Sequence, residues 1–122
     1  MQSQNYQLID YMLQGNTVDH ISVRKMGIAV LNSRTSNIRA MGFNLLKKDN
    51  GKNYDEHYID TTKKYGIYRV NENDYLMSIN PELQVFTWTD KKDLAMGLRL
   101  KLMEFYDYLR KTMKYKIKVV EL

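Results

Sequence analysis

The chain has 122 residues, a net charge of +5 and no cysteine, which excludes disulfides and thiolate metal sites. Hydrophobic residues make up 43% of it, enough for the core of one ordinary domain or two small ones. We expect no signal peptide, because residues 1–6 are polar, and no apolar run approaches the roughly 18 residues that span a bilayer. The expected location is therefore the cytoplasm, with no membrane partner.

Two short helices are predicted first. Residues 4–14 form an amphipathic pattern that Gly15 ends. A second helix is expected from Thr17, its N-cap, to Met26, with Gly27 supplying the positive φ that ends it. The expected buried positions are Tyr6, Ile9, Met12 and Leu13 in the first helix, and Val18, Ile21 and Met26 in the second.

A third helix is predicted from about Ile28 to Met41, and Gly42 closes it. Its apolar residues recur at steps of three and four, which places them on one face. The connection before it is so short that the second and third helices must cross steeply, as in a helix-turn-helix. The inner face carries Ile28, Leu31, Thr35, Ile38 and Met41.

The outer face of the third helix is small and amide-bearing, where a solvated helix would carry Glu and Lys. A helix in the major groove of DNA needs short side chains, so that its backbone approaches the bases, and Asn can read an adenine edge. Two arginines flank this face, where phosphates would lie. The alternative is a helix that packs on another protein element. The predicted base-contacting residues are Asn32, Ser33, Ser36 and Asn37, beside Ala29 and Ala40, and the predicted phosphate-contacting arginines are Arg34 and Arg39.

A strand over residues 43–48 and a type I′ turn at residues 49–51 predict a hairpin. Lys47, Lys48 and Lys52 surround the turn and are expected to contact phosphates, the alternative being a soluble loop tip. From Arg24 to Lys52 seven basic residues stand against one acid, the footprint of a nucleic-acid binder. The returning strand is expected at residues 54–59 or 65–70, with some pairing in both places.

Residues 65–122 predict a second unit, with the boundary between 59 and 71. Strands are expected over residues 65–70, 75–79, 85–88 and 115–122. One long helix is predicted from a Thr89-Asp90 cap to about Met113, with additional apolar residues beside its main stripe that favour either a partner surface or simple core packing. The stripe is Leu94, Leu98, Leu102, Phe105, Leu109 and Met113, and the residues beside it are Met103, Tyr106 and Tyr108.

No active site is predicted. The sequence has no glycine-rich phosphate loop, no nucleophile elbow and no cluster with the spacing of metal ligands. His20 and His57 are therefore expected to be surface or hydrogen-bonding residues. We predict a protein that is not an enzyme, with no catalytic residue, no metal and no cofactor.

The pattern Leu31-x-x-Arg34-x-x-x-Ile38-Arg39-x-x-Gly42-x-x-Leu45, after a short helix and the Gly27 turn, resembles the winged helix-turn-helix domains of small phage and prophage proteins. The resemblance covers roughly residues 5–70, and Thr35 stands where the family usually has Ile. It implies an α+β fold with a winged helix-turn-helix over residues 1–64. Residues 65–122 only loosely resemble β-β-α-β units of other small phage proteins.

These features predict a DNA-binding transcriptional regulator of a phage or mobile element, acting on duplex DNA in the cytoplasm of the host cell. The C-terminal unit would then pair two protomers into a homodimer or contact a partner. The alternative is a phage-encoded inhibitor of a host protein or nucleoprotein complex, for example an anti-CRISPR protein acting on a Cas nuclease. In that case the C-terminal unit would be the interaction surface.

Overall fold

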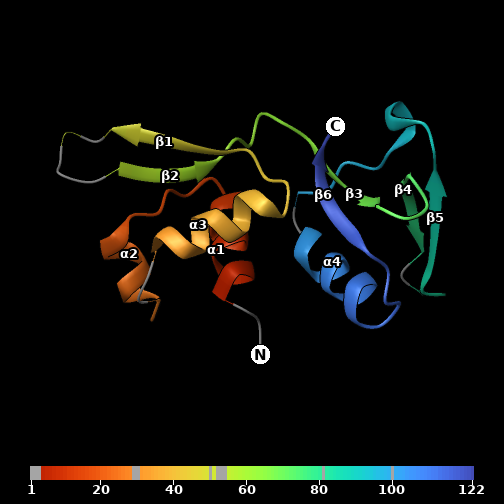
Figure 1. The fold of residues 1–122 in the computed structure, drawn as a ribbon, viewed down its shortest axis with the longest axis horizontal. Coiled ribbons are helices and arrows are strands. Elements are labelled where there is room, and N and C mark those ends of the chain that lie inside the picture. Colours follow the sequence, from red (N-terminus) through yellow and green to blue (C-terminus); the bar gives the residue numbers. More distant parts are fainter. Residues whose placement is uncertain (1–3, 29–30, 50, 52–54, 81, 100) are drawn as a thin grey trace. The chain divides into compact units, whose positions relative to one another are not determined.

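The protein has an α+β fold with helices and two antiparallel sheets (Figure 1). The computed structural model describes residues 4–28, 31–49, 51, 55–80, 82–99 and 101–122. The chain divides into two compact units, Met1–Thr62 and Lys63–Leu122. None of the helices within those ranges is long and apolar enough to cross a bilayer.

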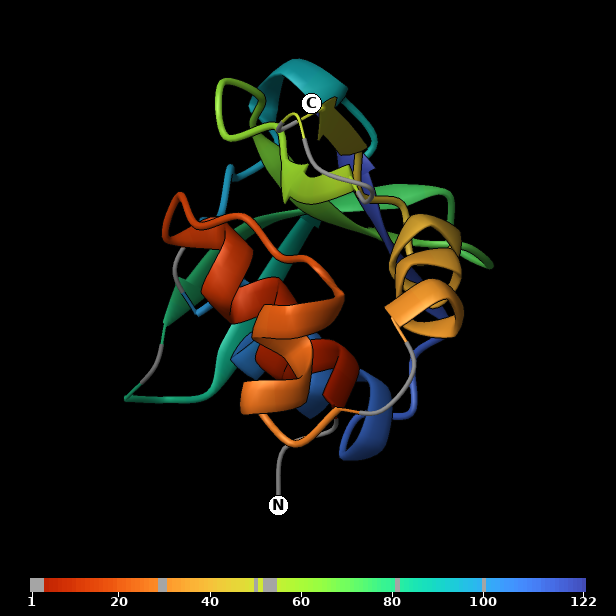
Figure 2. The same cartoon turned by 90° about the vertical axis from the view of Figure 1, so that its left-hand side faces the viewer.

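The N-terminal unit groups three helices beside a two-stranded hairpin, as Figures 1 and 2 show. The helices are α1 (Gln4–Leu13), α2 (His20–Lys25) and α3 (Leu31–Ala40). α1 lies against α3 and against the second strand of the hairpin. It buries all four predicted inner residues and also Leu8, so its apolar face is wider than the sequence pattern indicated. α1 therefore supplies a large part of the core of this unit.

α2 begins later than predicted, because Asp19 and not Thr17 is its N-cap. The Asp19 Oδ1 accepts hydrogen bonds from the backbone N–H groups of Ile21 (2.9 Å) and Ser22 (2.7 Å). The Ser22 hydroxyl oxygen accepts from the backbone N–H of Asp19 at 2.9 Å, which completes a capping box. The bonds to Ser22 and Ile21 stabilise the carboxylate and lower the pKa of Asp19 although its slight burial opposes this.

The C-terminal end of α2 is as predicted, with Gly27 at a φ of +81°. The Gly27 N–H donates to the Arg24 carbonyl at 3.0 Å and the Ile28 N–H donates to the Val23 carbonyl at 2.8 Å, a Schellman motif. Val23 and Ile28 are both buried and anchor this turn. The prediction that Ile21 is buried is wrong, since its side chain is 43% exposed. A helix of six residues presents little more than one turn to the core, and Val23 occupies that position.

α3 begins at Leu31 rather than Ile28, because Ile28 belongs to the turn that closes α2. Leu31, Thr35 and Ile38 are buried as predicted, whereas Met41 lies beyond the helix and is half-buried. The Thr35 hydroxyl donates to the carbonyl of Asn32 at 2.9 Å. This local bond satisfies a polar group at an otherwise apolar position. Ala29 lies outside the described residues.

The hairpin pairs β1 (Leu45–Asp49) with β2 (Asp55–Ile59), so the returning strand is the earlier of the two predicted segments. The prediction of a type I′ turn at residues 49–51 does not fit this register, because the last described pair is Asp49 with Asp55 and five residues lie between them in the sequence. Of these five, Asn50 and residues 52–54 lie outside the described residues. Gly51 has a φ of +76°, and its N–H donates to the Asp49 carboxylate at 2.8 Å.

β2 is hydrogen-bonded on both edges. On one side His57 pairs with Lys47 of β1. On the other side the Val18 N–H donates to the His57 carbonyl at 2.8 Å and the His57 N–H donates to the Val18 carbonyl at 2.7 Å. Val18, predicted as a residue of α2, is thus a buried one-residue strand that joins the chain before α2 to the hairpin after α3.

The C-terminal unit is a four-stranded sheet covered on one face by α4 (Leu102–Lys111). The strands are β3 (Tyr65–Arg69), β4 (Asp74–Asn80), β5 (Val85–Thr89) and β6 (Ile117–Glu121), in the order β5-β4-β3-β6. α4 buries Leu102, Met103, Tyr106 and Leu109. The sheet residues Tyr65, Ile67, Leu76 and Val119 are buried with them.

The first half of the predicted long helix is wrong. Lys92–Leu94 is a single 3₁₀ turn (η1), and the chain after it is extended. The Met96 N–H donates to the Leu76 carbonyl and the Leu98 N–H to the Tyr65 carbonyl, both at 2.8 Å. β3 and β4 pair at only two positions, so these bonds satisfy carbonyls that the short pairing leaves open. Hydrogen bonding to two strands thus overrides the helical periodicity of this segment.

Arg69 at the end of β3 contacts β4, β5 and the segment that leads into β6. Its Nε donates to the Asp74 Oδ1 at 2.7 Å and its Nη2 donates to Oδ2 of the same carboxylate. The guanidinium lies 4.0 Å from the ring centroid of Trp88 on β5 and 4.9 Å from that of Tyr115, which leads into β6. The hydrogen bonds to Asp74 raise the pKa of Arg69 further, so the side chain remains charged.

Replacement of Arg69 by Lys should therefore destabilise the C-terminal unit. An ammonium retains the charge but cannot make the two-pronged bond to Asp74 or stack on Trp88. We expect a loss of about 1.5–3 kcal/mol in the free energy of unfolding, the usual size for hydrogen bonds to charged groups. Urea unfolding followed by the fluorescence of Trp88 measures it. The matched control is Arg110→Lys, whose half-exposed side chain lies 3.9 Å from Asp107 and should cost less than about 0.5 kcal/mol. Equal losses in both variants would contradict this role.

Candidate nucleic-acid interface

α3 presents a continuous polar face to solvent. Its inner side is fixed by Leu31, Thr35 and Ile38, which forces the residues between them outward. Within the described part of the chain, the four predicted base-contacting side chains make no hydrogen bond or ion pair, so their donors and acceptors are open to a ligand. The exposed residues are Asn32, Ser33, Ser36, Asn37, Arg39 and Ala40, whereas Arg34 is half-buried.

The two arginines of α3 face no acid on their own helix, since α3 contains none. Arg39 and Lys47 of β1 are both close enough to His57 to lower its pKa electrostatically. One cation of α3 and one of the hairpin thus lie within electrostatic range of the same buried imidazole. These two residues, both predicted to contact phosphate, are eight positions apart in the sequence.

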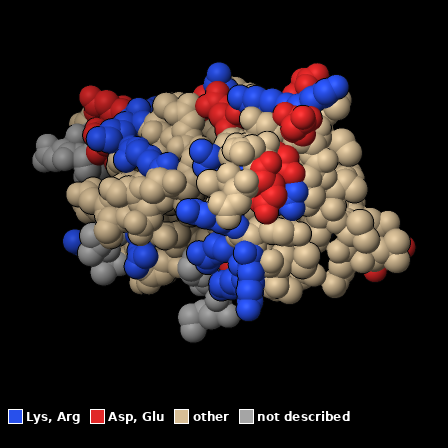
Figure 3. All heavy atoms as spheres, turned by 45° about the vertical axis from the view of Figure 1, so that its right-hand side comes forward, with Lys and Arg blue, Asp and Glu red and all other residues tan. Residues whose placement is uncertain are grey.

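The hairpin is less basic than its first strand indicated. Lys47 and Lys48 are exposed as expected, but the register places Glu56 opposite Lys48 and Asp55 opposite Asp49. Lys52 lies outside the described residues. Over residues 1–62 seven basic residues stand against six acids, whereas residues 63–122 have twelve against eight. On the face drawn in Figure 3, acidic side chains likewise lie among the basic ones.

His57, the middle residue of β2, is buried, with 7% of its surface exposed. Of the two expected roles, a surface or a hydrogen-bonding residue, the first is wrong, because His57 alternates with Ile59 on the inner face of β2, where both are buried. Among the described atoms its Nδ1 has no hydrogen-bond partner. Burial lowers the pKa of His57, the charges of Arg39 and Lys47 lower it further, and Asp55 opposes them. The imidazole is therefore neutral at pH 7.

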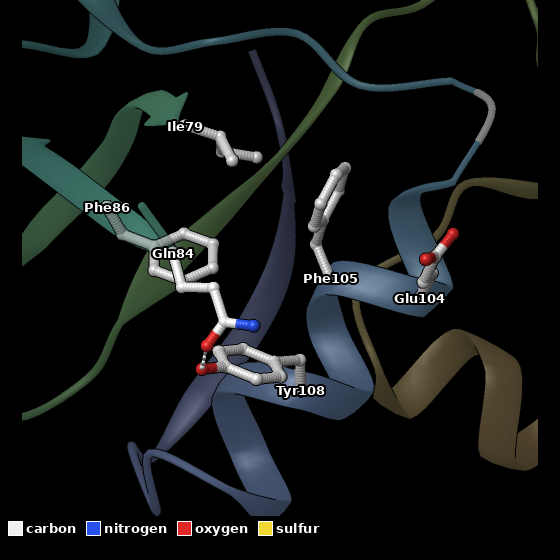
Figure 4. Close-up of a pocket in the computed structure, with 6 residues that line it drawn as sticks. All are labelled: Ile79, Gln84, Phe86, Glu104, Phe105 and Tyr108. Atoms are coloured by element: carbon white, nitrogen blue, oxygen red, sulfur yellow. Dashed lines mark hydrogen bonds between the residues drawn. The ribbon is translucent and has the colours of Figure 1, made fainter. Parts of the chain in front are cut away.

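A recess of about 210 Å³ opens between α4 and the strands β4 and β5 of the C-terminal unit (Figure 4). Phe86 and Tyr108 stack at its wall with ring centroids 5.5 Å apart, and the Tyr108 hydroxyl donates to the Gln84 side chain at 3.2 Å. Ile79 and Phe105 complete its apolar lining, and Figure 4 shows the Glu104 carboxylate directed away from Gln84 and Phe86. Since few polar groups converge here, the recess lacks the features of a site for chemistry.

In comparisons with known proteins, no family model, no curated protein and no solved structure matches the chain. Function is therefore inferred from the exposed side chains of α3 and their surroundings.

His57 predicts a pH dependence of stability for the N-terminal unit. Its pKa is lower in the folded chain than in the unfolded chain, where it is about 6.5. Stability is therefore full above about pH 6.5 and is lost as the pH falls toward the folded pKa, because only the unfolded chain binds the proton. Urea unfolding between about pH 7.5 and 5 measures this loss. His57→Gln should flatten it, whereas the control His20→Gln should leave it unchanged. An unaltered profile in His57→Gln would contradict the assignment.

Proposed function

We propose that the N-terminal unit is a winged helix-turn-helix that binds duplex DNA, and that the protein is a transcriptional regulator. The observation that carries this proposal is the exposed face of α3. It combines short polar side chains with two flanking arginines on a helix free of acids. Such a face suits close approach to the edges of base pairs in a major groove.

The topology of the unit supports the proposal. α2 and α3 are joined through a glycine turn, as the two helices of a helix-turn-helix are. The hairpin of β1 and β2 follows α3 directly, in the position of a wing, and Val18 between α1 and α2 adds a short third strand to it. The backbone bonds at His57 hold this wing against the helices.

In this proposal α3 lies in the major groove and carries most of the affinity. The amides of Asn32 and Asn37 can each donate to and accept from an adenine edge, and the hydroxyls of Ser33 and Ser36 can meet other base edges. Arg34, Arg39 and Lys47 would contact phosphates, which set the position of the helix. Because acids flank Lys48 on the hairpin, the wing adds less attraction for phosphate than its lysines alone would.

A single carboxylate on α3 should therefore disrupt binding. We expect Ser36→Glu to weaken the affinity for a short duplex by about tenfold or more, because the new charge faces phosphates and base acceptors. Fluorescence anisotropy with random-sequence and promoter duplexes, over about 50 to 200 mM salt, measures the effect. Gln7→Glu is the matched control, since it adds the same charge at an exposed position of α1. It should change the affinity by less than about twofold.

Two outcomes would overturn the proposal. One is the absence of duplex binding by the parent protein even at the lowest salt, which would favour the alternative of an inhibitor that docks on a host protein. The other is equal weakening by Ser36→Glu and Gln7→Glu, which would mean that only the total charge matters.

A further inference from the structure

The sheet of the C-terminal unit has two unlike faces. Residues that alternate along the strands toward α4 form the core, and Tyr65, Ile67 and Leu76 among them have no exposed surface. The residues between them point to the opposite face, where Gly66 is buried against the Leu122 side chain and the others are half-buried or exposed. This opposite face, which we call the tyrosine face, includes Gly66, Tyr68, Tyr75, Ser78, Asn80, Val85, Thr87, Thr89, Lys116, Lys118 and Val120.

One row of the tyrosine face runs across all four strands. The register pairs Lys118 with Tyr68, Tyr68 with Tyr75, and Tyr75 with Thr89. The two tyrosine rings lie in contact at the centre, with centroids 5.0 Å apart and planes inclined by 56°. The Tyr68 hydroxyl donates to the Asn73 side chain at 2.8 Å, which fixes the orientation of that ring. The row is therefore a rigid aromatic platform bordered by a lysine on one side and a hydroxyl on the other.

The charge of the tyrosine face is entirely positive. None of the described residues that the register places there is acidic. Lys118 lies with its Nζ 5.4 Å from the ring centroid of Tyr68, and Lys116 is exposed two residues before it on the same side. These lysines end a stretch, residues 110–118, that contains five basic residues and no acid.

We propose that the tyrosine face binds single-stranded nucleic acid. Unpaired bases would stack on Tyr68 and Tyr75, and the phosphates beside them would meet Lys116 and Lys118. The hydroxyls of Ser78, Thr87 and Thr89 can hydrogen-bond to sugars and phosphates. A duplex does not fit this chemistry, because its bases are already stacked on one another and its outer surface offers the rings no aromatic partner. This binding is independent of the function proposed for α3.

Substitution of Tyr75 separates stacking from simple charge attraction. The probe is a labelled oligothymidylate of about 12 nucleotides, within the range of site sizes known for such platforms. Tyr75→Thr should weaken its binding by about tenfold, because one stacking surface is lost. Tyr75→Phe is the matched control and should bind within about twofold of the parent protein, because stacking needs the ring and not the hydroxyl. Thermal unfolding followed by Trp88 fluorescence establishes that both variants are folded.

Further measurements identify the ligand and distinguish this proposal from duplex binding by α3. Lys118→Gln should lower the salt dependence of binding, because one phosphate contact is lost. An oligouridylate of the same length shows whether RNA or DNA is preferred. Tyr75→Thr should leave duplex binding unchanged, and Ser36→Glu should leave oligothymidylate binding unchanged. The proposal is overturned if the parent protein does not bind either single strand at low salt, or if Tyr75→Thr and Tyr75→Phe bind equally well.

Discussion

The N-terminal unit depends on the two-sided pairing of β2 at His57. One edge of this residue joins Lys47, which follows α3, and the other joins Val18, which precedes α2. The segment before α2 and the segment after α3 are thereby both hydrogen-bonded to β2. This restricts the positions that α2 and α3 can take within the unit. The same pairing turns the His57 imidazole inward, beside the charges of Arg39 and Lys47. The exposed face of α3 is a consequence of this arrangement. Because Leu31, Thr35 and Ile38 are buried in the core, the opposite side of the helix faces solvent.

Charge is distributed differently in space than along the chain. The basic stretch before residue 52 is followed by Asp55 and Glu56, which the hairpin register returns to the side of Lys48 and Asp49. α3 itself carries two arginines and no acid, whereas the lysines of the hairpin lie beside acids. In the C-terminal unit the positive charge gathers after α4, and Lys116 and Lys118 bring it onto an open sheet face. The two units thus differ in where their positive charge lies.

Local signals in the sequence were sufficient for much of the fold. The inner face of α3, the positive φ of Gly27 and the strand that contains Ile117 and Val119 follow from periodicity and turn chemistry. The extended segment around Leu98 was not predictable in this way, because its bonds to Tyr65 and Leu76 come from strands distant in sequence. The exposure of the outer residues of α3 could be predicted from helical periodicity alone. The tyrosine face could not be predicted, because it depends on the strand register that places Tyr68 beside Tyr75. That register cannot be derived from a single sequence.

The central claim is that α3 is the surface that meets duplex DNA. A titration of the isotope-labelled protein with a short duplex, followed by amide chemical shifts in NMR spectra, tests it most directly. We expect the largest shifts at the backbone amides of Asn32, Ser33, Ser36 and Asn37, with smaller ones at Lys47 and Lys48 of the hairpin. Shifts confined to residues 63–122, or no shift at low salt, would contradict it.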